Sequence, residues 1–147
     1  MSLLETLNDD IKVAMKSKDK EALAILRMIK TSIQNEQINK GEDLSPDEEL
    51  TLVSREMKQR KESLSEFEKA GRSDLVEQAS FGISIVARYL PEQLSDEELK
   101  SIITEAIASV DATSMKDFGK VMGVVMPKTK GKADGQKINA LVKELIS

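Results

Sequence analysis

The stretch MPKTKGKADG, from Met126 to Gly135, places three lysines at alternate positions, together with a proline and two glycines. Lysine ammonium groups are compact point charges that suit contact with phosphate oxygens better than bidentate recognition of base edges. A helix that begins after such a stretch offers free backbone N–H groups and the positive end of its dipole. The pattern therefore favours binding to a sugar-phosphate backbone. The alternative is a hydrophilic turn in which Asp134 caps the last helix.

The charge of this region differs from that of the rest of the chain. Six lysines and two acidic residues lie between Ser114 and Lys137, whereas all 147 residues together have a formal net charge of −4. A basic segment within an acidic protein indicates a local surface for a negatively charged partner. The candidate residues for binding such a partner, a nucleic-acid backbone in the first place, are Lys116, Lys120, Lys128, Lys130, Lys132 and Lys137.

A second basic cluster lies in the stretch SREMKQRKES. Glu56 and Arg60 stand four residues apart, as do Lys58 and Glu62. Residues at this spacing are neighbours on a helix surface, so ordinary ion pairs account for most of this cluster. We assign no ligand to it.

The chain lacks the residues that most catalytic and metal sites require. It contains no histidine and no cysteine, which excludes Ser-His-Asp and Cys-His arrangements and leaves only carboxylates for zinc. A phosphate loop ending at Lys128 and Thr129 is excluded as well, because Met122 and Pro127 occupy the positions where glycines are needed. We therefore expect no catalytic residues, no metal and no cofactor. An enzyme that uses a desolvated lysine or a carboxylate is the remaining alternative, and it requires a lysine with a strongly lowered pKa in a pocket.

Apolar residues recur at helical spacing throughout, and no segment alternates with period two for long enough to form a strand. This pattern predicts an all-α protein with a four-helix N-terminal subdomain over residues 1–91 and a three-helix C-terminal tail subdomain over residues 92–147. The expected helix starts are at Ser2, Asp19, Ser45, Ser73, Ser95, Ser114 and Asp134. Pro91 is expected to end the fourth helix.

Two glycines, Gly119 and Gly123, fall within the expected sixth helix. Each costs roughly 1 kcal/mol relative to alanine in a helix interior, so an offsetting role is expected. We expect them to let another helix approach closely. The alternative is the close approach of a ligand backbone.

Three stretches together resemble the GatB/YqeY family: LAILRMIKTSIQNEQI, YLPEQLSDEEL and DFGKVMGVVMPKTKGKADGQKINALVKELI. The resemblance covers essentially the whole chain and implies a free-standing bacterial member of that family. Its relatives form the C-terminal helical and tail portion of the B subunit of glutamine-dependent aspartyl/glutamyl-tRNA amidotransferase, and an appended domain in some glutaminyl-tRNA synthetases.

The resemblance implies a noncatalytic, tRNA-binding accessory module. The contact with tRNA would fall on Lys120, Lys128, Lys130 and Lys132, with Gly119, Gly123, Gly131 and Gly135 shaping the backbone. Carbon–nitrogen ligase activity would be inherited only as a family label. An alternative function is a protein-interaction module that docks on an amidotransferase or an aminoacyl-tRNA synthetase through an apolar face near Phe81, Gly82 and Leu90.

The sequence also bears on the cellular compartment. The N-terminal residues MSLLETLNDD lack the basic region and the apolar stretch of a signal peptide, and nothing approaches eighteen consecutive apolar residues. This predicts a cytoplasmic protein without a membrane partner. The oligomeric state is left open.

Overall fold

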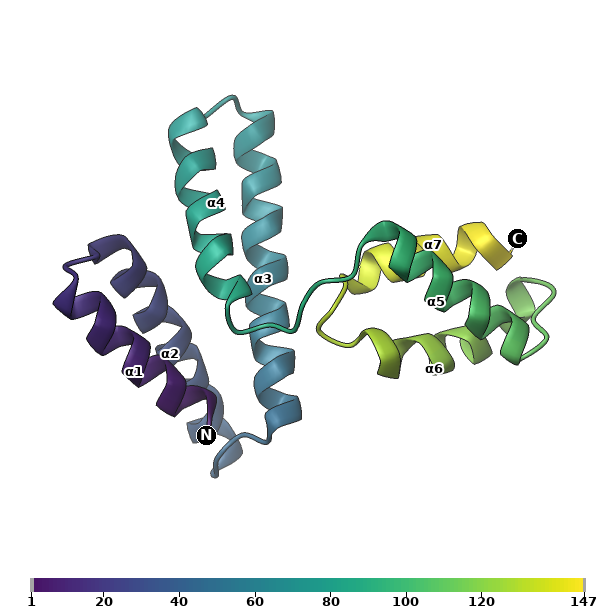
Figure 1. Ribbon diagram of the computed structural model, residues 1–147, viewed down its shortest axis with the longest axis horizontal. Helices are drawn as coiled ribbons and strands as arrows, with labels where there is room; N and C mark the ends of the chain where they lie inside the picture. Colours follow the sequence, from purple (N-terminus) through teal and green to yellow (C-terminus); the bar gives the residue numbers. More distant parts are fainter. Residues whose placement is uncertain (1, 147) are drawn as a thin grey trace. The chain divides into compact units, whose positions relative to one another are not determined.

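The computed structural model describes residues 2–146, which form seven α-helices and one short 3-10 helix without any strand. The prediction of an all-α protein is therefore confirmed. The helices fall into two compact units, of which the first ends at Leu90 and the second begins at Pro91 (Figure 1). Each unit has its own apolar core.

The N-terminal unit consists of two helical hairpins. Helix α1 (Leu3–Lys16) lies beside α2 (Lys20–Lys40), and α3 (Pro46–Lys69) lies beside α4 (Ser73–Ala87). Helix α2 also contacts both α3 and α4, which joins the hairpins. The fully buried large side chains of this unit are Leu7, Leu26, Ile29, Ile33, Val53, Ile85 and Val86.

Local sequence signals account for the ends of most of these helices. The Ser45 hydroxyl accepts a hydrogen bond from the N–H of Glu48, whose carboxylate accepts one from the N–H of Ser45 in return. Helix α2 ends at Gly41, whose φ of 83° is a left-handed conformation that glycine adopts without strain. The Lys40 ammonium contacts the same Glu48 carboxylate, which holds the pKa of Glu48 at about 2.

Helix α4 differs from the expectation at both ends. Arg72 rather than Ser73 occupies the N-cap position, and no side chain caps the helix. The α-helix ends at Ala87, before Pro91, because the N–H groups of Arg88, Tyr89 and Leu90 bond to carbonyls three residues earlier, as in tighter turns. The chain continues in turns, where the Tyr89 hydroxyl donates a hydrogen bond to the Asp10 carboxylate of α1. Burial is the main cause of the raised pKa of Tyr89.

The C-terminal unit is built from α5 (Asp96–Ser109), the 3-10 helix η1 (Met115–Asp117), α6 (Phe118–Thr129) and α7 (Gly135–Ile146). Helices α5, α6 and α7 contact one another in pairs. Ser95 and Glu98 form the expected capping box at the start of α5. The fully buried large side chains are Leu99, Ile103, Val121, Val125, Ile138 and Val142.

Helix α6 departs from the sequence expectation in two ways. Ser114 caps η1 instead of α6, and α6 continues through Pro127 to Thr129. An interior proline normally breaks a helix because it lacks an N–H and its ring crowds the preceding turn. Here Pro127 is exposed, while Val125 and Thr129 on either side of it are fully buried and the Thr129 hydroxyl donates to the Val125 carbonyl at 3.0 Å. Burial of this last turn therefore holds the helix together past the proline.

Candidate nucleic-acid interface

Helix α6 has one buried face and one exposed face. Val121, Val125 and Thr129 point into the core of the C-terminal unit. The solvent-exposed positions on the other side, which we call the exposed face of α6, are Gly119, Lys120, Gly123, Met126 and Pro127. No acidic residue occurs in the helix. A partner that meets this face therefore encounters backbone, apolar side chains and positive charge.

The two glycines leave the backbone of this face bare. Apart from the adjacent residues and the backbone of α6 itself, no atom of the described residues lies within 4 Å of a Cβ built at Gly119 or at Gly123. The expectation that these glycines admit another helix of the subdomain is therefore wrong, since nothing is packed closely against them. Pro127 has no N–H to donate to the Gly123 carbonyl four residues earlier, so this carbonyl lacks its usual partner in the helix.

Lys116 and Lys120 lie at the N-terminal end of this face. Lys116 is an exposed residue of η1. The Lys120 side chain is 71% exposed and its ammonium lies 3.8 Å from the Asp117 carboxylate. That carboxylate also accepts a hydrogen bond from the N–H of Thr113 at 3.0 Å. An exposed ion pair of this kind is weak, so the Lys120 ammonium stays accessible to another anion.

Lys128, Lys130 and Lys132 lie where α6 ends, and the structure corrects how they are arranged. Lys128 is in the last turn of α6 and not in a loop, and Lys130 follows as the C-cap. The Lys132 carbonyl accepts a hydrogen bond from the N–H of Leu94 at 2.9 Å, and the Gln93 side chain donates to the Gly131 carbonyl at 2.8 Å. The lysine-bearing turn is therefore anchored to the segment that precedes α5.

The start of α7 offers less to a phosphate than its sequence suggested. The Asp134 carboxylate accepts a hydrogen bond from the N–H of Gln136 at 3.2 Å, as expected for a cap. A phosphate at this helix end would have to compete with that carboxylate. Lys137 lies in the first turn of α7 and forms an ion pair with Asp96 of α5, which lowers the pKa of Asp96. Lys137 is thus paired with an acidic residue of α5.

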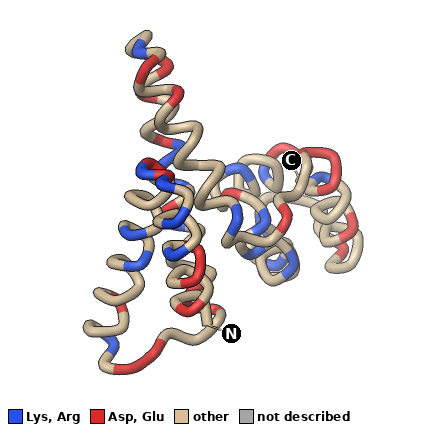
Figure 2. The backbone as a smooth tube through the Cα atoms, turned by 60° about the vertical axis from the view of Figure 1, so that its left-hand side comes forward, with Lys and Arg blue, Asp and Glu red and all other residues tan. Residues whose placement is uncertain are grey.

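Charges of both signs are spread over the two units (Figure 2). In the C-terminal unit, α5 carries the acidic residues Asp96, Glu97, Glu98 and Glu105, whereas the segment from η1 to the start of α7 carries the six candidate lysines. A negatively charged partner would therefore favour α6 over α5.

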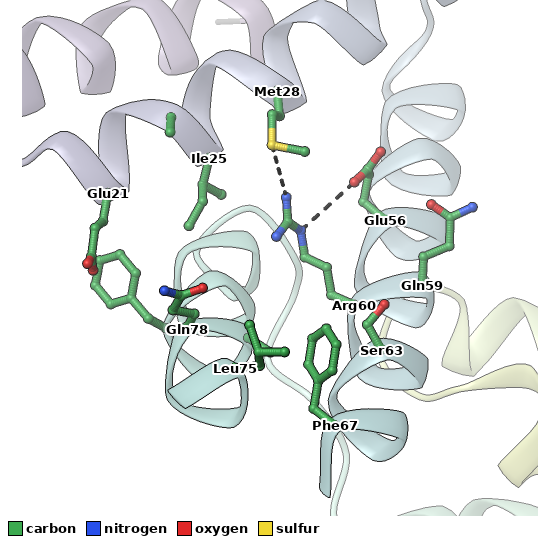
Figure 3. Close-up of a pocket in the computed structure, with 13 residues that line it drawn as sticks. Glu21, Ile25, Met28, Glu56, Gln59, Arg60, Ser63, Phe67, Leu75 and Gln78 are labelled. Carbon is green, nitrogen blue, oxygen red and sulfur yellow. Dashed lines mark hydrogen bonds and ion pairs between the residues drawn. The ribbon is translucent and has the colours of Figure 1, made fainter. Parts of the chain in front are cut away.

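A groove in the N-terminal unit is a second feature of the structure, and the sequence did not reveal it. It has a volume of about 550 Å³ and is lined by residues of α2, α3 and α4 (Figure 3). Arg60, expected to be part of a surface ion pair, has a side chain only 19% exposed and extends into this groove. One feature of the sequence pointed to the buried position of Arg60, namely a glycine, Gly82, within an expected helix. In the structure a Cβ at Gly82 would lie 2.8 Å from the Arg60 Nη1, so glycine leaves room for the guanidinium.

The apolar docking face expected near Phe81, Gly82 and Leu90 is only partly present. Phe81 lines the groove, whereas Gly82 is buried and Leu90 packs against the core. The exposed apolar surface therefore extends from Phe81 toward α2 and α3 rather than toward Leu90.

Two properties of residues 2–146 bear on membranes and metals. None of the helices described combines the length and the apolar character that a membrane crossing demands. Within the same residues, acidic side chains do not gather in threes in a way that could hold a metal ion.

Comparison with known proteins gives consistent results over nearly the whole chain. The sequence profile of the family described as Yqey-like protein matches residues 4–146. A protein from Pyrenophora tritici-repentis, named "Altered inheritance of mitochondria protein 41, mitochondrial", is 29% identical over 148 residues, which cover 98% of this chain and 81% of that protein.

Proteins of the same name from two other fungi are also similar. The one from Lachancea thermotolerans is 35% identical over 123 residues, covering 78% of this chain. The one from Clavispora lusitaniae is 35% identical over 115 residues, covering 76% of this chain. The matched region spans 66% of the length of each of these two relatives.

These names overturn the prediction of a cytoplasmic protein, because the curated relatives are mitochondrial proteins. The prediction depended on the lack of a secretory signal and of a long apolar run, and neither feature distinguishes one internal compartment from another. The bacterial origin that the resemblance implied finds no support among these fungal relatives. The match over residues 4–146 does settle the family, and this chain belongs to the YqeY-like proteins.

Proposed function

We propose that this chain is a noncatalytic accessory module that binds tRNA through the exposed face of α6 and the lysines at its two ends. The observation that carries the proposal is the pair of uncovered glycines between those lysines. Gly119 and Gly123 are exposed, and none of the described residues of the C-terminal unit packs against them from outside α6, although glycine weakens a helix. A ligand that approaches the backbone closely would account for both facts.

Double-stranded regions of tRNA suit this surface. RNA helices are recognised largely by shape, through phosphates and 2′-hydroxyl groups displayed in a wide, shallow groove. Lysines at both ends of α6 supply point charges for phosphates on either side of such a groove. The Gly123 carbonyl, which Pro127 cannot engage, is an acceptor for a 2′-hydroxyl. The resemblance of the lysine-bearing stretch to the tail of the amidotransferase B subunit supports tRNA as the RNA in question.

The experiment that tests the proposal is a salt series of tRNA binding with two charge-reversal variants. The first changes Lys116, Lys120 and Lys128 to glutamate. The matched control changes Lys12, Lys16 and Lys20 to glutamate, which alters the net charge equally at exposed positions of the N-terminal unit.

Only the first variant is expected to lose a large part of its affinity. Removing one lysine–phosphate interaction should flatten the dependence of log K on log salt concentration by about 0.7 to 0.9, so removing three should flatten it by about two to three. If both variants lose affinity equally, the attraction comes from overall charge and α6 is not the interface. If the unaltered chain binds no tRNA at moderate salt, the proposal is wrong.

A further inference from the structure

The groove of the N-terminal unit is an open trough between its two helical hairpins (Figure 3). Its walls come from α2 on one side and from α3 and α4 on the other. Along α3 it extends from Glu56 to Phe67, a distance of about 16 Å at 1.5 Å per residue, or about three helical turns. The apolar lining residues are Ala24, Ile25, Met28, Phe67, Leu75, Ala79 and Phe81.

Arg60 is the one basic side chain among the residues that line this groove, and its hydrogen-bonding capacity is poorly used. Its buried Nε has no acceptor within hydrogen-bond distance among the described residues, and the nearest oxygen of Glu56 lies at 4.0 Å. Nη2 is 4.0 Å from the Met28 sulfur, which is a weak acceptor. Glu56 is itself shared, since it also accepts a hydrogen bond from the Ser32 hydroxyl at 3.2 Å.

An arginine with unsatisfied N–H donors can bind the carboxylate of another molecule. A guanidinium group binds a carboxylate through two parallel hydrogen bonds, and such charge-assisted bonds are stronger than neutral ones. The apolar walls make the interaction stronger still, because they exclude water from it. Glu21 lines the groove seven residues before Met28 on α2, about two helical turns away. The groove therefore presents the Arg60 guanidinium near Met28, with the Glu56 carboxylate beside it, and a separate carboxylate at Glu21.

We propose that the groove receives an amphipathic helix of a partner protein, which packs apolar side chains between α2, α3 and α4 and places a carboxylate against Arg60. A trough open along its length does not enclose a small molecule, whose sites normally bury most of the ligand surface. A helix laid into a groove between helices buries one apolar face and leaves its polar face in water. The two charged sites specify the partner further, with an acidic residue and a basic residue about two turns apart.

This inference is independent of the tRNA interface, which lies on α6 in the other unit. The probe is a phage-displayed library of 14-residue peptides, with apolar residues fixed at helical spacing and the remaining positions randomised. The library is selected against the full chain. Enriched peptides are expected to carry an acidic residue beside the apolar stripe and a basic residue about two turns from it.

Three variants locate the binding of an enriched peptide. Arg60→Gln should weaken binding at least about tenfold, and replacing the peptide's acidic residue with its amide should add little further loss in that variant. Ala24→Arg fills the groove from an exposed position on α2 and should abolish binding, whereas Ala87→Arg, at an exposed position outside the groove, should not. Circular dichroism checks that each variant is folded. If Arg60→Gln does not fold, Ala24→Arg still tests whether the peptide binds in the groove.

Several results would overturn the proposal. They are a selection that enriches no peptide, enriched peptides without an acidic residue, and peptides that bind Arg60→Gln or Ala24→Arg as well as the unaltered chain. Binding of tRNA should be the same for Ala24→Arg and the unaltered chain. If the groove binds no peptide, the proposed tRNA binding is therefore unaffected. If the chain binds no tRNA, the groove proposal is likewise unaffected.

Discussion

Replacing Gly123 with alanine should stabilise the C-terminal unit and weaken tRNA binding at the same time. Gly123 lies in the middle of α6, and a Cβ at this position would meet no atom of the described residues within 4 Å, apart from the adjacent residues and the helix's own backbone. The gain in helix propensity, about 1 kcal/mol, is therefore not offset by a clash. Gly119 lies in the first turn of α6, so Gly119→Ala should give a smaller gain of the same sign.

Hydrogen exchange measures this effect within the correct unit. The amides of the buried residues Val121, Val125 and Val142 exchange when the C-terminal unit opens. A stabilisation of about 1 kcal/mol should slow their exchange about fivefold in Gly123→Ala. The amides of Ile29 and Val53, buried in the other unit, serve as the internal control.

The same variant should bind tRNA less tightly, because the added methyl group holds the RNA away from the backbone of α6. Two results would refute this reasoning in different ways. Faster exchange would mean that the fold itself requires a glycine at position 123, for example to accommodate the ring of Pro127. Slower exchange with unchanged tRNA affinity would mean that RNA does not approach this part of the helix.

Three further predictions concern stability and ionisation. Lys40→Met should raise the pKa of Glu48 from about 2 toward its usual 4.5, and NMR titration measures this change. In the unaltered chain the ion pair stabilises the fold at pH values above 4.5. This stabilisation disappears as the pH falls toward 2, because Glu48 becomes protonated. Ile103→Ala should lower the free energy of unfolding, measured with denaturant, by about 2 to 5 kcal/mol, because the side chain is fully buried. Ser95→Ala should lower the same free energy of unfolding by about 1 kcal/mol, because it removes the N-cap of α5. Ser73→Ala removes no cap and should leave it almost unchanged.

Helix starts could be predicted from sequence where the signal is chemical and local. The pair of Ser45 and Glu48 forms a capping box whatever surrounds it, because all of its hydrogen bonds join residues within one turn. Pro127 shows the limit of such reasoning. Its local effect is to end a helix, but burial of Val125 and Thr129 outweighs that effect, and burial depends on the position of other helices.

The role of Arg60 could not be predicted for a related reason. Glu56 and Arg60 at a spacing of four give the same sequence pattern whether they lie in open solvent or beside a groove. Only the positions of α2 and α4 show that the guanidinium lies close to Met28 and Gly82. The excess of lysines over acidic residues between Ser114 and Lys137 needs no such information, because it is a property of the sequence itself.

The contact between Tyr89 and Asp10 has a practical consequence for spectroscopy. The chain contains one tyrosine and no tryptophan, so Tyr89 supplies nearly all of its intrinsic fluorescence. The hydroxyl is held by a carboxylate of α1, and its emission should change when that contact breaks. Far-ultraviolet ellipticity, in contrast, responds to helices in both units. Recorded together during heating, the two signals assign each unfolding transition to the unit in which it occurs.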